Sequence, residues 1–232
     1  MKHTALFLTF IIVILALCGI SACHPTVTPA GNLTNINFSY EDFSEIEISQ
    51  GFSATVSRSD AFSINVTFDD ALQEYFIIEQ HGKLLQIGLD GGPDYLNAVR
   101  KVRITLPDLR RLKISGMTVA EVTGFNTRQP VELELTGGSM MKLEDMVTAN
   151  AGFKLSGESQ IEGMITMSEG NLVLSGASTA TLEGSAESTR LDGSDQSRFS
   201  MADFTTETAA VKLSGSSRAS LDIVSRLDLD LR

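Results

Sequence analysis

A repeat of about 20 residues in the second half of the chain constrains the fold more than any other feature. Each copy pairs an apolar-polar-apolar alternation with Ser, Thr or Asp, a glycine and further hydroxyl residues. The aligned glycines are Gly116, Gly137, Gly157, Gly176, Gly193 and Gly215. They are separated by 21, 20, 19, 17 and 22 residues, which is 99 residues over five intervals. Internal similarity at such a period is typical of solenoids.

The repeat unit predicts two short strands joined by a tight turn. Apolar residues stand two positions before every aligned glycine and four positions before most of them, and this period of two indicates a half-buried strand. The glycine permits a backbone conformation that other residues resist, so the chain turns there. A second inward strand is predicted by the apolar residue six positions after five of the glycines, namely Val122, Leu143, Leu182, Phe199 and Leu221.

A unit this short cannot bury its apolar side alone, whereas a stack of such units can. We therefore predict an all-β chain built as a parallel β-solenoid with coils of about 20 residues. The alternative is an antiparallel sandwich, and the scarcity of Asn-Gly and Asp-Gly hairpin pairs argues against it. The hydroxyl residues beside the glycines are expected to form ladders of hydrogen bonds from coil to coil. Less regular coils of the same kind are predicted for the first half, where Asp69 is expected to cap one helical turn.

The first 22 residues have the form of a bacterial lipoprotein signal peptide. A basic start precedes an apolar run over residues 5–18, which is shorter than the roughly 20 residues of a membrane-spanning helix. The ending Ile20-Ser21-Ala22-Cys23 resembles the lipobox, which implies cleavage before Cys23 and diacylation of that cysteine. We expect residues 23–37 to be the lipidated cysteine and a flexible tether that holds the protein to a membrane. The alternatives are a plain signal peptide and an uncleaved anchor.

Composition excludes several function classes. The formal net charge of −11 argues against binding to nucleic acid or to an anionic membrane surface. Cleavage would leave Cys23 as the only cysteine, which excludes disulfides, thiol catalysis and cysteine-ligated zinc. Histidine is nearly absent after the signal peptide, with only His24 and His81. The chain therefore lacks the histidines that a catalytic triad or an imidazole zinc site requires. We expect no cofactor.

One repeat carries two carboxylates where the others carry hydroxyl residues, and this makes it a candidate functional site. The two residues are Asp192 and Asp195, which stand on either side of Gly193. Aspartate suits turns and hydrogen-bonds the local backbone much as serine does, and this is the interpretation that we favour. Two alternatives remain: a Ca²⁺ site that also uses Ser194 and Ser197, and a pair of acid/base carboxylates for glycoside cleavage.

The order of the elements resembles one known family. The relevant segments are residues 43–52, 69–72, 82–89 and 102–109, followed by the Leu-Ser-Gly-Ala-Ser repeats. Together they resemble the auto-transporter adhesin "head GIN" domain family of bacterial secreted and lipid-anchored proteins. The resemblance implies a right-handed β-helix over residues 38–232 and a place at the cell surface or in the cell envelope. It implies no catalytic residue. The residue after Cys23 is not acidic, which favours the outer membrane.

These observations predict a non-enzymatic, lipid-anchored envelope protein whose solenoid binds an envelope or extracellular ligand. One alternative is a polysaccharide-active enzyme that uses Asp192 and Asp195. The other is a structural module that forms homo-oligomers through the solenoid ends. An alternating charge ladder of Lys113, Glu134 and Lys154 is expected to pair between coils on a solvated face, where each pair contributes only about 0–1 kcal/mol.

Overall fold

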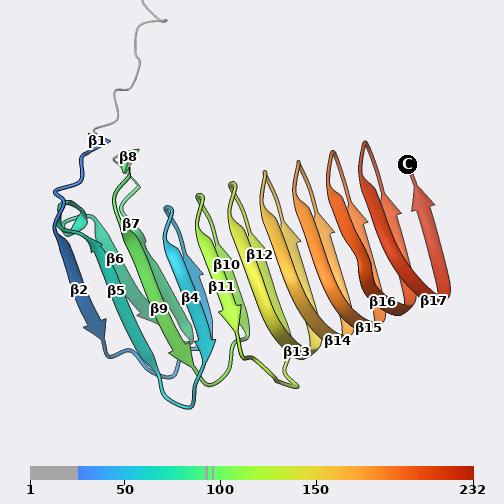
Figure 1. The fold of residues 1–232 in the computed structure, drawn as a ribbon, viewed down its shortest axis with the longest axis horizontal. Helices are drawn as coiled ribbons and strands as arrows, with labels where there is room; N and C mark the ends of the chain where they lie inside the picture. The colour runs from blue at the N-terminus through green and yellow to red at the C-terminus, as the bar shows by residue number, and fades with distance from the viewer. Residues whose placement is uncertain (1–25, 92–93, 96) are drawn as a thin grey trace, which may run out of the picture.

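Each regular coil follows the same path: one strand runs to a tight turn, a second strand leaves the turn, and a rounded arc leads to the next coil (Figure 1). The computed structural model describes residues 26–91, 94–95 and 97–232. Strands of successive coils pair in parallel, as predicted. The strands of the regular coils are β10 (Arg111–Ile114), β11 (Val119–Thr123), β12 (Val131–Leu135), β13 (Met140–Leu155), β14 (Gln160–Leu174), β15 (Thr179–Gly193), β16 (Arg198–Leu213) and β17 (Arg218–Leu231).

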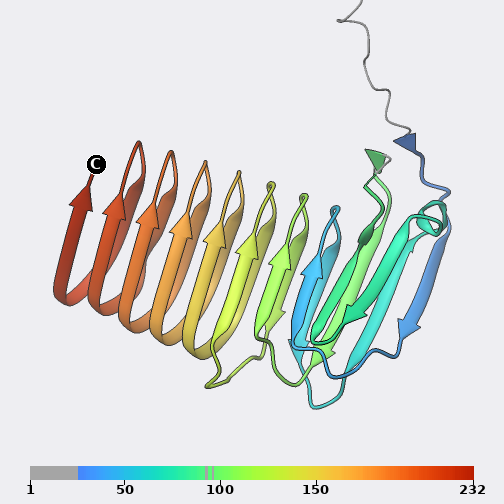
Figure 2. The ribbon, with the colours of Figure 1, turned by 180° about the vertical axis from the view of Figure 1, so that it is seen from behind.

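The coils form two faces, because each strand from β13 onward continues around the arc. The first face contains β11 and the first halves of β13–β17, and the second face contains β10, β12 and the second halves of β13–β17. In Figure 2 the second face is nearer to the viewer, its strands run up to the turns, and the chain advances to the left, so the coils wind in the right-handed sense.

The glycines of the turns have the predicted conformation, but most turn hydroxyl groups have other hydrogen-bond partners than predicted. Five of the aligned glycines have φ between 62° and 78°, in the left-handed region, and Gly193 does not. The buried hydroxyl residue that ends each turn mostly donates to a carbonyl of its own turn, for example from Ser178 Oγ to Ser175 O at 2.8 Å. The coil-to-coil bonds at this corner come chiefly from backbone N–H groups, such as Ser175 N to Leu155 O. The predicted hydroxyl bonding from coil to coil is confirmed only in part. Ser175, Ser178 and Ser214 donate to carbonyls of the preceding coil at 3.3–3.5 Å, and among the described turns a direct hydroxyl-to-hydroxyl contact joins Ser197 and Ser217 at 3.3 Å.

The first half forms two further coils and an antiparallel cap. β3 (Glu45–Ile48) and β4 (Ser53–Arg58) make one coil, and β7 (Leu84–Leu89) and β9 (Arg100–Leu106) make the next one outward. Beyond them β5 (Ser63–Asp69) pairs antiparallel with β9, β2 (Leu33–Phe38) with β5, and β6 (Phe76–His81) with β7. The prediction of coils in the first half is thus wrong for β5 and β6, whose direction is reversed. The small bridge of β1 (Thr26–Val27) and β8 (Asp94–Tyr95) is parallel.

Part of the predicted tether belongs to this cap. Residues 1–25, which include the predicted signal peptide and Cys23, lie outside the described part of the chain. The prediction of a flexible tether as far as residue 37 is wrong from Leu33 onward, because β2 is paired along its whole length. The buried carboxylate of Asp69 also accepts hydrogen bonds from Ala30 N at 2.8 Å and Gly31 N at 3.1 Å.

Asp69 caps a single helical turn, as predicted. Its carboxylate accepts from Ala71 N at 3.0 Å at the start of the 3₁₀ turn η1 (Asp70–Leu72). Backbone hydrogen bonds, foremost from Ala30, lower the pKa of Asp69 because they favour its ionised form. The described residues contain no helix with the length and hydropathy of a membrane span.

Candidate binding surface

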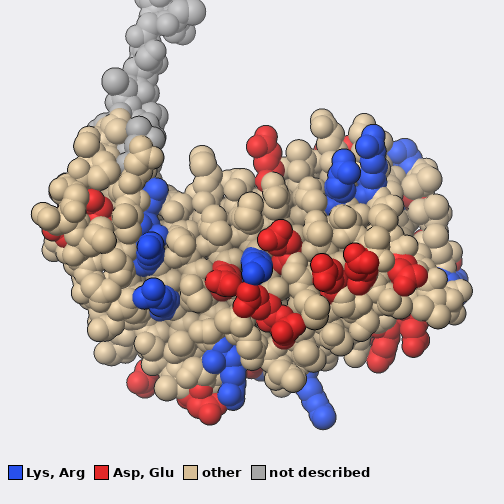
Figure 3. Space-filling view, in the orientation of Figure 1, with Lys and Arg blue, Asp and Glu red and all other residues tan. Residues whose placement is uncertain are grey.

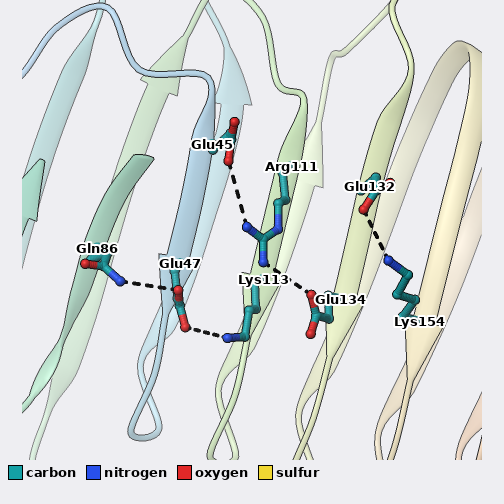
Figure 4. Close-up of polar contacts among 8 residues, drawn as sticks. All are labelled: Glu45, Glu47, Gln86, Arg111, Lys113, Glu132, Glu134 and Lys154. Carbon is teal, nitrogen blue, oxygen red and sulfur yellow. Dashed lines mark hydrogen bonds and ion pairs between the residues drawn. The ribbon is translucent and has the colours of Figure 1, made fainter. Parts of the chain in front are cut away.

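The second face carries a ladder of alternating charges. Lys113 Nζ lies 2.7 Å from Glu47 of the preceding coil, and Arg111 lies 3.4 Å from Glu134 of the following coil (Figure 4). Lys154 pairs with Glu132 at 3.5 Å. The prediction of inter-coil ion pairs is confirmed, although Lys113, Glu134 and Lys154 pair with other residues rather than with one another. The reason is diagonal reach: long side chains on a sheet contact neighbours two positions away as well as directly opposite.

Ionisation at the centre of this ladder is stabilised by its neighbours. Partial burial of Glu47 by itself raises the pKa of the carboxyl group. Hydrogen bonds from Lys113 and from Gln86 at 3.4 Å outweigh this effect and hold the pKa of Glu47 below its usual value. The carboxylate therefore stays charged, and the ladder keeps its alternating pattern at neutral pH.

The ladder is interrupted further along the second face, and a groove lies at the interruption. The outward row that holds Arg111 and Glu132 in earlier coils continues through Gly152, Asn171, Arg190, Ala210 and Asp228, so uncharged residues are interspersed with charged ones from β13 onward. The resulting groove crosses β12–β17 and has a volume of about 640 Å³. Its polar and charged lining consists of Glu132, Asn150, Glu169, Asn171, Ser188, Thr189, Arg190, Thr208, Arg226 and Asp228.

The chemistry of the groove is mixed in sign and rich in hydrogen-bonding groups. Arg190 forms no ion pair with any residue that the structure describes, whereas Arg226 lies 2.9 Å from Asp228. Hydroxyl and amide groups of Asn150, Asn171 and Thr208 also line the groove, and no aromatic ring does. Such a surface can pair with the backbone and charges of an extended polar chain but offers no platform on which a sugar ring could stack.

The first face also carries a row of charged side chains. Glu121 of β11, Lys142 of β13 and Glu162 of β14 occupy successive positions of one row. Figure 3 shows acidic side chains gathered over the middle of this face. A hydrogen bond from Lys142 at 2.8 Å lowers the pKa of Glu144. These charges are exposed, and we assign no site to them.

The fifth coil is in a different register from the one that the sequence predicted. Strand pairing places Gly193 beside Leu174 and Leu213, so Gly193 occupies an inward strand position and not the turn. Asp195, with φ of 64°, is the residue in the left-handed turn position. The turn residues are thus Gly116, Gly137, Gly157, Gly176, Asp195 and Gly215, with intervals of 21, 20, 19, 19 and 20 residues. The inward residue six positions after the turn residue is therefore Met201, counted from Asp195, rather than Phe199, counted from Gly193. Met201 is buried.

Packing explains why this coil differs. A Cβ on Gly193 would lie 2.7 Å from the ring of Phe199, which is buried in the core. Neighbouring coils place Leu174 with Ala180 and Leu213 with Ala219 at the same two positions. The fifth coil therefore exchanges a leucine and an alanine for a glycine and a phenylalanine, which keeps the volume of the core layer.

The two predicted site residues lie on different elements. Asp192 points outward from β15 and lies 3.7 Å from Lys212, so it belongs to the charge ladder. Asp195 lies in the turn, where its carboxylate accepts from Gly176 N at 3.1 Å and from Ser194 Oγ at 3.2 Å. Among the described residues no group of three or more His, Cys, Asp or Glu side chains could hold a metal ion. His81 is exposed and lies 3.0 Å from Glu79.

The groove residues were not predicted from the sequence. The signal was present in the repeat, because Gly152 and Ala210 are small at an outward position that is charged in other coils. When the fifth copy is aligned on Asp195 instead of Gly193, Arg190 occupies the same outward row as Gly152 and Ala210, five positions before the turn residue.

Comparison with known proteins decides the family. A family model described as "Putative auto-transporter adhesin, head GIN domain" matches residues 42–232. The chain belongs to this family. Membership indicates a protein of the cell surface or envelope, as predicted. No curated protein matches the chain significantly.

Solved structures share the fold of this head GIN chain. A putative adhesin from Parabacteroides distasonis ATCC 8503 is 17% identical, with a TM-score of 0.73 over 88% of this chain and 99% of the other. A putative adhesin from Parabacteroides merdae ATCC 43184 is 14% identical, with a TM-score of 0.69 over 90% and 99%. A putative lipid binding protein from P. distasonis is 14% identical, with a TM-score of 0.66 over 87% and 98%. At these identities the likeness establishes the fold alone.

Proposed function

We propose that this protein is a non-enzymatic, lipid-anchored envelope protein that binds an extended polar segment of a partner protein in the groove of the second face. The groove itself carries the proposal, because it lies where Gly152 and Ala210 interrupt a row of outward charged side chains. Small outward side chains leave room for a ligand, and the surrounding charges and amides supply its hydrogen bonds.

Lipid attachment at Cys23 would hold this surface at a membrane. The lipobox-like residues 20–23 support this part of the proposal, together with the envelope location of the family. Incorporation of labelled palmitate tests it: we expect labelling of the full-length chain and none in the Cys23→Ala variant. Equal labelling of both would contradict lipidation at Cys23.

Ligand binding can be tested with residues 24–232 on an array of envelope proteins, extracellular proteins and glycans. Arg190→Glu should weaken a saturable interaction with a protein at least tenfold. Arg103→Glu on the first face makes the same charge change away from the groove and should leave the interaction unchanged. Binding that both variants preserve, or hits among glycans alone, would contradict the proposal. Repeating the array with Ca²⁺ also tests the alternative interpretation of Asp192 and Asp195 as calcium ligands.

A further inference from the structure

Strand β17 forms an uncovered edge of the solenoid among the described residues. It pairs with β16 on one side and with no described strand on the other. Its inward residues Leu227, Leu229 and Leu231 continue the core rows of Ala209, Val211 and Leu213. They are nevertheless 47%, 55% and 64% exposed. A long apolar edge strand is a template for pairing with another chain, and proteins normally protect such edges.

We propose that a second copy of this chain covers this end in a closed two-fold dimer. The axis would pass through the arc at Val224, parallel to the strands. It would place the first-face half of each β17 antiparallel to the second-face half of the other. In this register Leu221 lies opposite the partner's Leu227, and Ala219 lies opposite the partner's Leu229. All four point inward, so the apolar rows of the two solenoids become continuous.

The charges of β17 fit this register. Arg218 lies opposite the partner's Asp230, and Asp222 lies opposite the partner's Arg226, so two-fold symmetry gives four ion pairs. A shift by two residues would instead bring Arg218 to the partner's Arg232 and Asp222 to the partner's Asp228. The outward charges of β17 therefore exclude that shift. The opposite shift would place Arg218 opposite the partner's Asp228, but it would also set Leu221 opposite the partner's Ser225, so the apolar rows disfavour it.

Three of the charges already have partners within the chain, which they can exchange for the contacts of the dimer. Thr205 Oγ1 donates to Asp222 at 3.1 Å. Arg226 pairs with Asp228, and Arg232 with Asp230, in each case at 2.9 Å within β17. Both pairs are highly exposed, so exchanging them for intersubunit pairs costs little. A self-complementary patch is what an isologous two-fold interface requires, and such an interface closes without forming fibres. The proposal does not depend on ligand binding in the groove.

Cysteine cross-linking of the full-length chain in isolated membranes tests the interface. Val224→Cys would place two thiols near the axis, and mild oxidation should give a disulfide-linked dimer. Met117→Cys is the control, since both side chains are about as exposed, 69% and 76%, but Met117 lies in a turn remote from β17. Absence of the dimer, an equal yield from both variants, or cross-linking to another protein would overturn the proposal.

Charge reversal tests the register in the Val224→Cys background. Asp230→Arg should reduce the dimer yield at least tenfold, because it faces the partner's Arg218. Adding Arg218→Asp should restore the yield, because the reversed charges again attract. This rescue also shows that the single variant remained folded. A yield that Asp230→Arg leaves unchanged, or that the double variant fails to restore, would overturn the assigned pairing.

Discussion

The two ends of the solenoid are finished in different ways. At the N-terminal end the strands β2, β5 and β6 pair antiparallel with their neighbours, and the ring of Phe76 packs 4.9 Å from Phe68 and 5.8 Å from Phe38 over the core. At the C-terminal end β17 remains parallel, and its leucines are left exposed. Every coil of a repeat exposes an edge on which another coil can stack. Each end of the solenoid therefore has to be covered by something other than the repeat itself.

The largest effect is expected where neighbouring coils approach most closely. A Cβ on Gly163 would lie 2.0 Å from Leu143 O, and the backbone there has φ of +125°. We expect Gly163→Ala to lower the free energy of unfolding by about 5 kcal/mol or more, because backbone atoms cannot give way. Gly138→Ala, where the nearest atom would be 3.9 Å away, should cost only about 1–2 kcal/mol. Urea unfolding measures both, and equal losses would contradict this account of the stack.

Core truncation should distinguish the interior from the open end. Phe153 is fully buried, and Phe153→Ala should cost about 3–5 kcal/mol through the cavity that it leaves. Leu229→Ala removes a half-exposed side chain and should cost less than about 1 kcal/mol in dilute protein, where the end is uncovered. Urea unfolding at low protein concentration compares them. A similar loss for both would mean that the C-terminal end is already covered within one chain.

The cap should be sensitive to acid through Asp69. Its pKa is lowered in the folded state, so its stabilising effect is complete above the unfolded pKa of about 3.9 and is lost as the pH falls through the lower folded value. Asp69→Asn should therefore lower the Tm at pH 7, and the difference from wild type should shrink below about pH 3. Asp203→Asn, at an exposed position of β16, controls for the removed charge. A difference that stays constant from pH 7 to pH 2 would contradict this role.

The smallest effect is expected at the turn of the fifth coil. Asp195→Gly should change the free energy of unfolding by less than about 0.5 kcal/mol, because relief of the left-handed backbone offsets the lost hydrogen bond to Gly176 N. Asp195→Val adds a β-branched side chain at the same φ and should cost about 1–2 kcal/mol. Urea unfolding of the two variants is the measurement, and equal losses would show that the carboxylate is the important group.

The coils could be predicted from the sequence because their determinants are local. Alternation at Leu172 and Leu174 and the glycine at Gly176 specify a strand and a turn without reference to distant residues. The error in the fifth copy has the same origin: Asp192-Gly193 has the local form of a turn, whereas the core fit between Gly193 and Phe199 is visible only in three dimensions.

The cap and the groove depend on contacts between distant residues. Alternation in β5 predicts a strand but cannot tell whether its neighbour runs parallel or antiparallel. Residues 33–38 pair with β5 along their whole length, and just before them the carboxylate of Asp69 binds Ala30 N and Gly31 N across almost 40 residues of sequence. The groove becomes apparent only when outward residues of six strands are compared row by row.

Hydrogen exchange at two protein concentrations tests most directly the claim that the ends differ. For residues 24–232, the amides of β17 should exchange rapidly in dilute solution and become protected as the concentration rises, while protection of β2, β5 and β6 stays constant. Protection of β17 that is already high in dilute protein and independent of concentration would contradict the account.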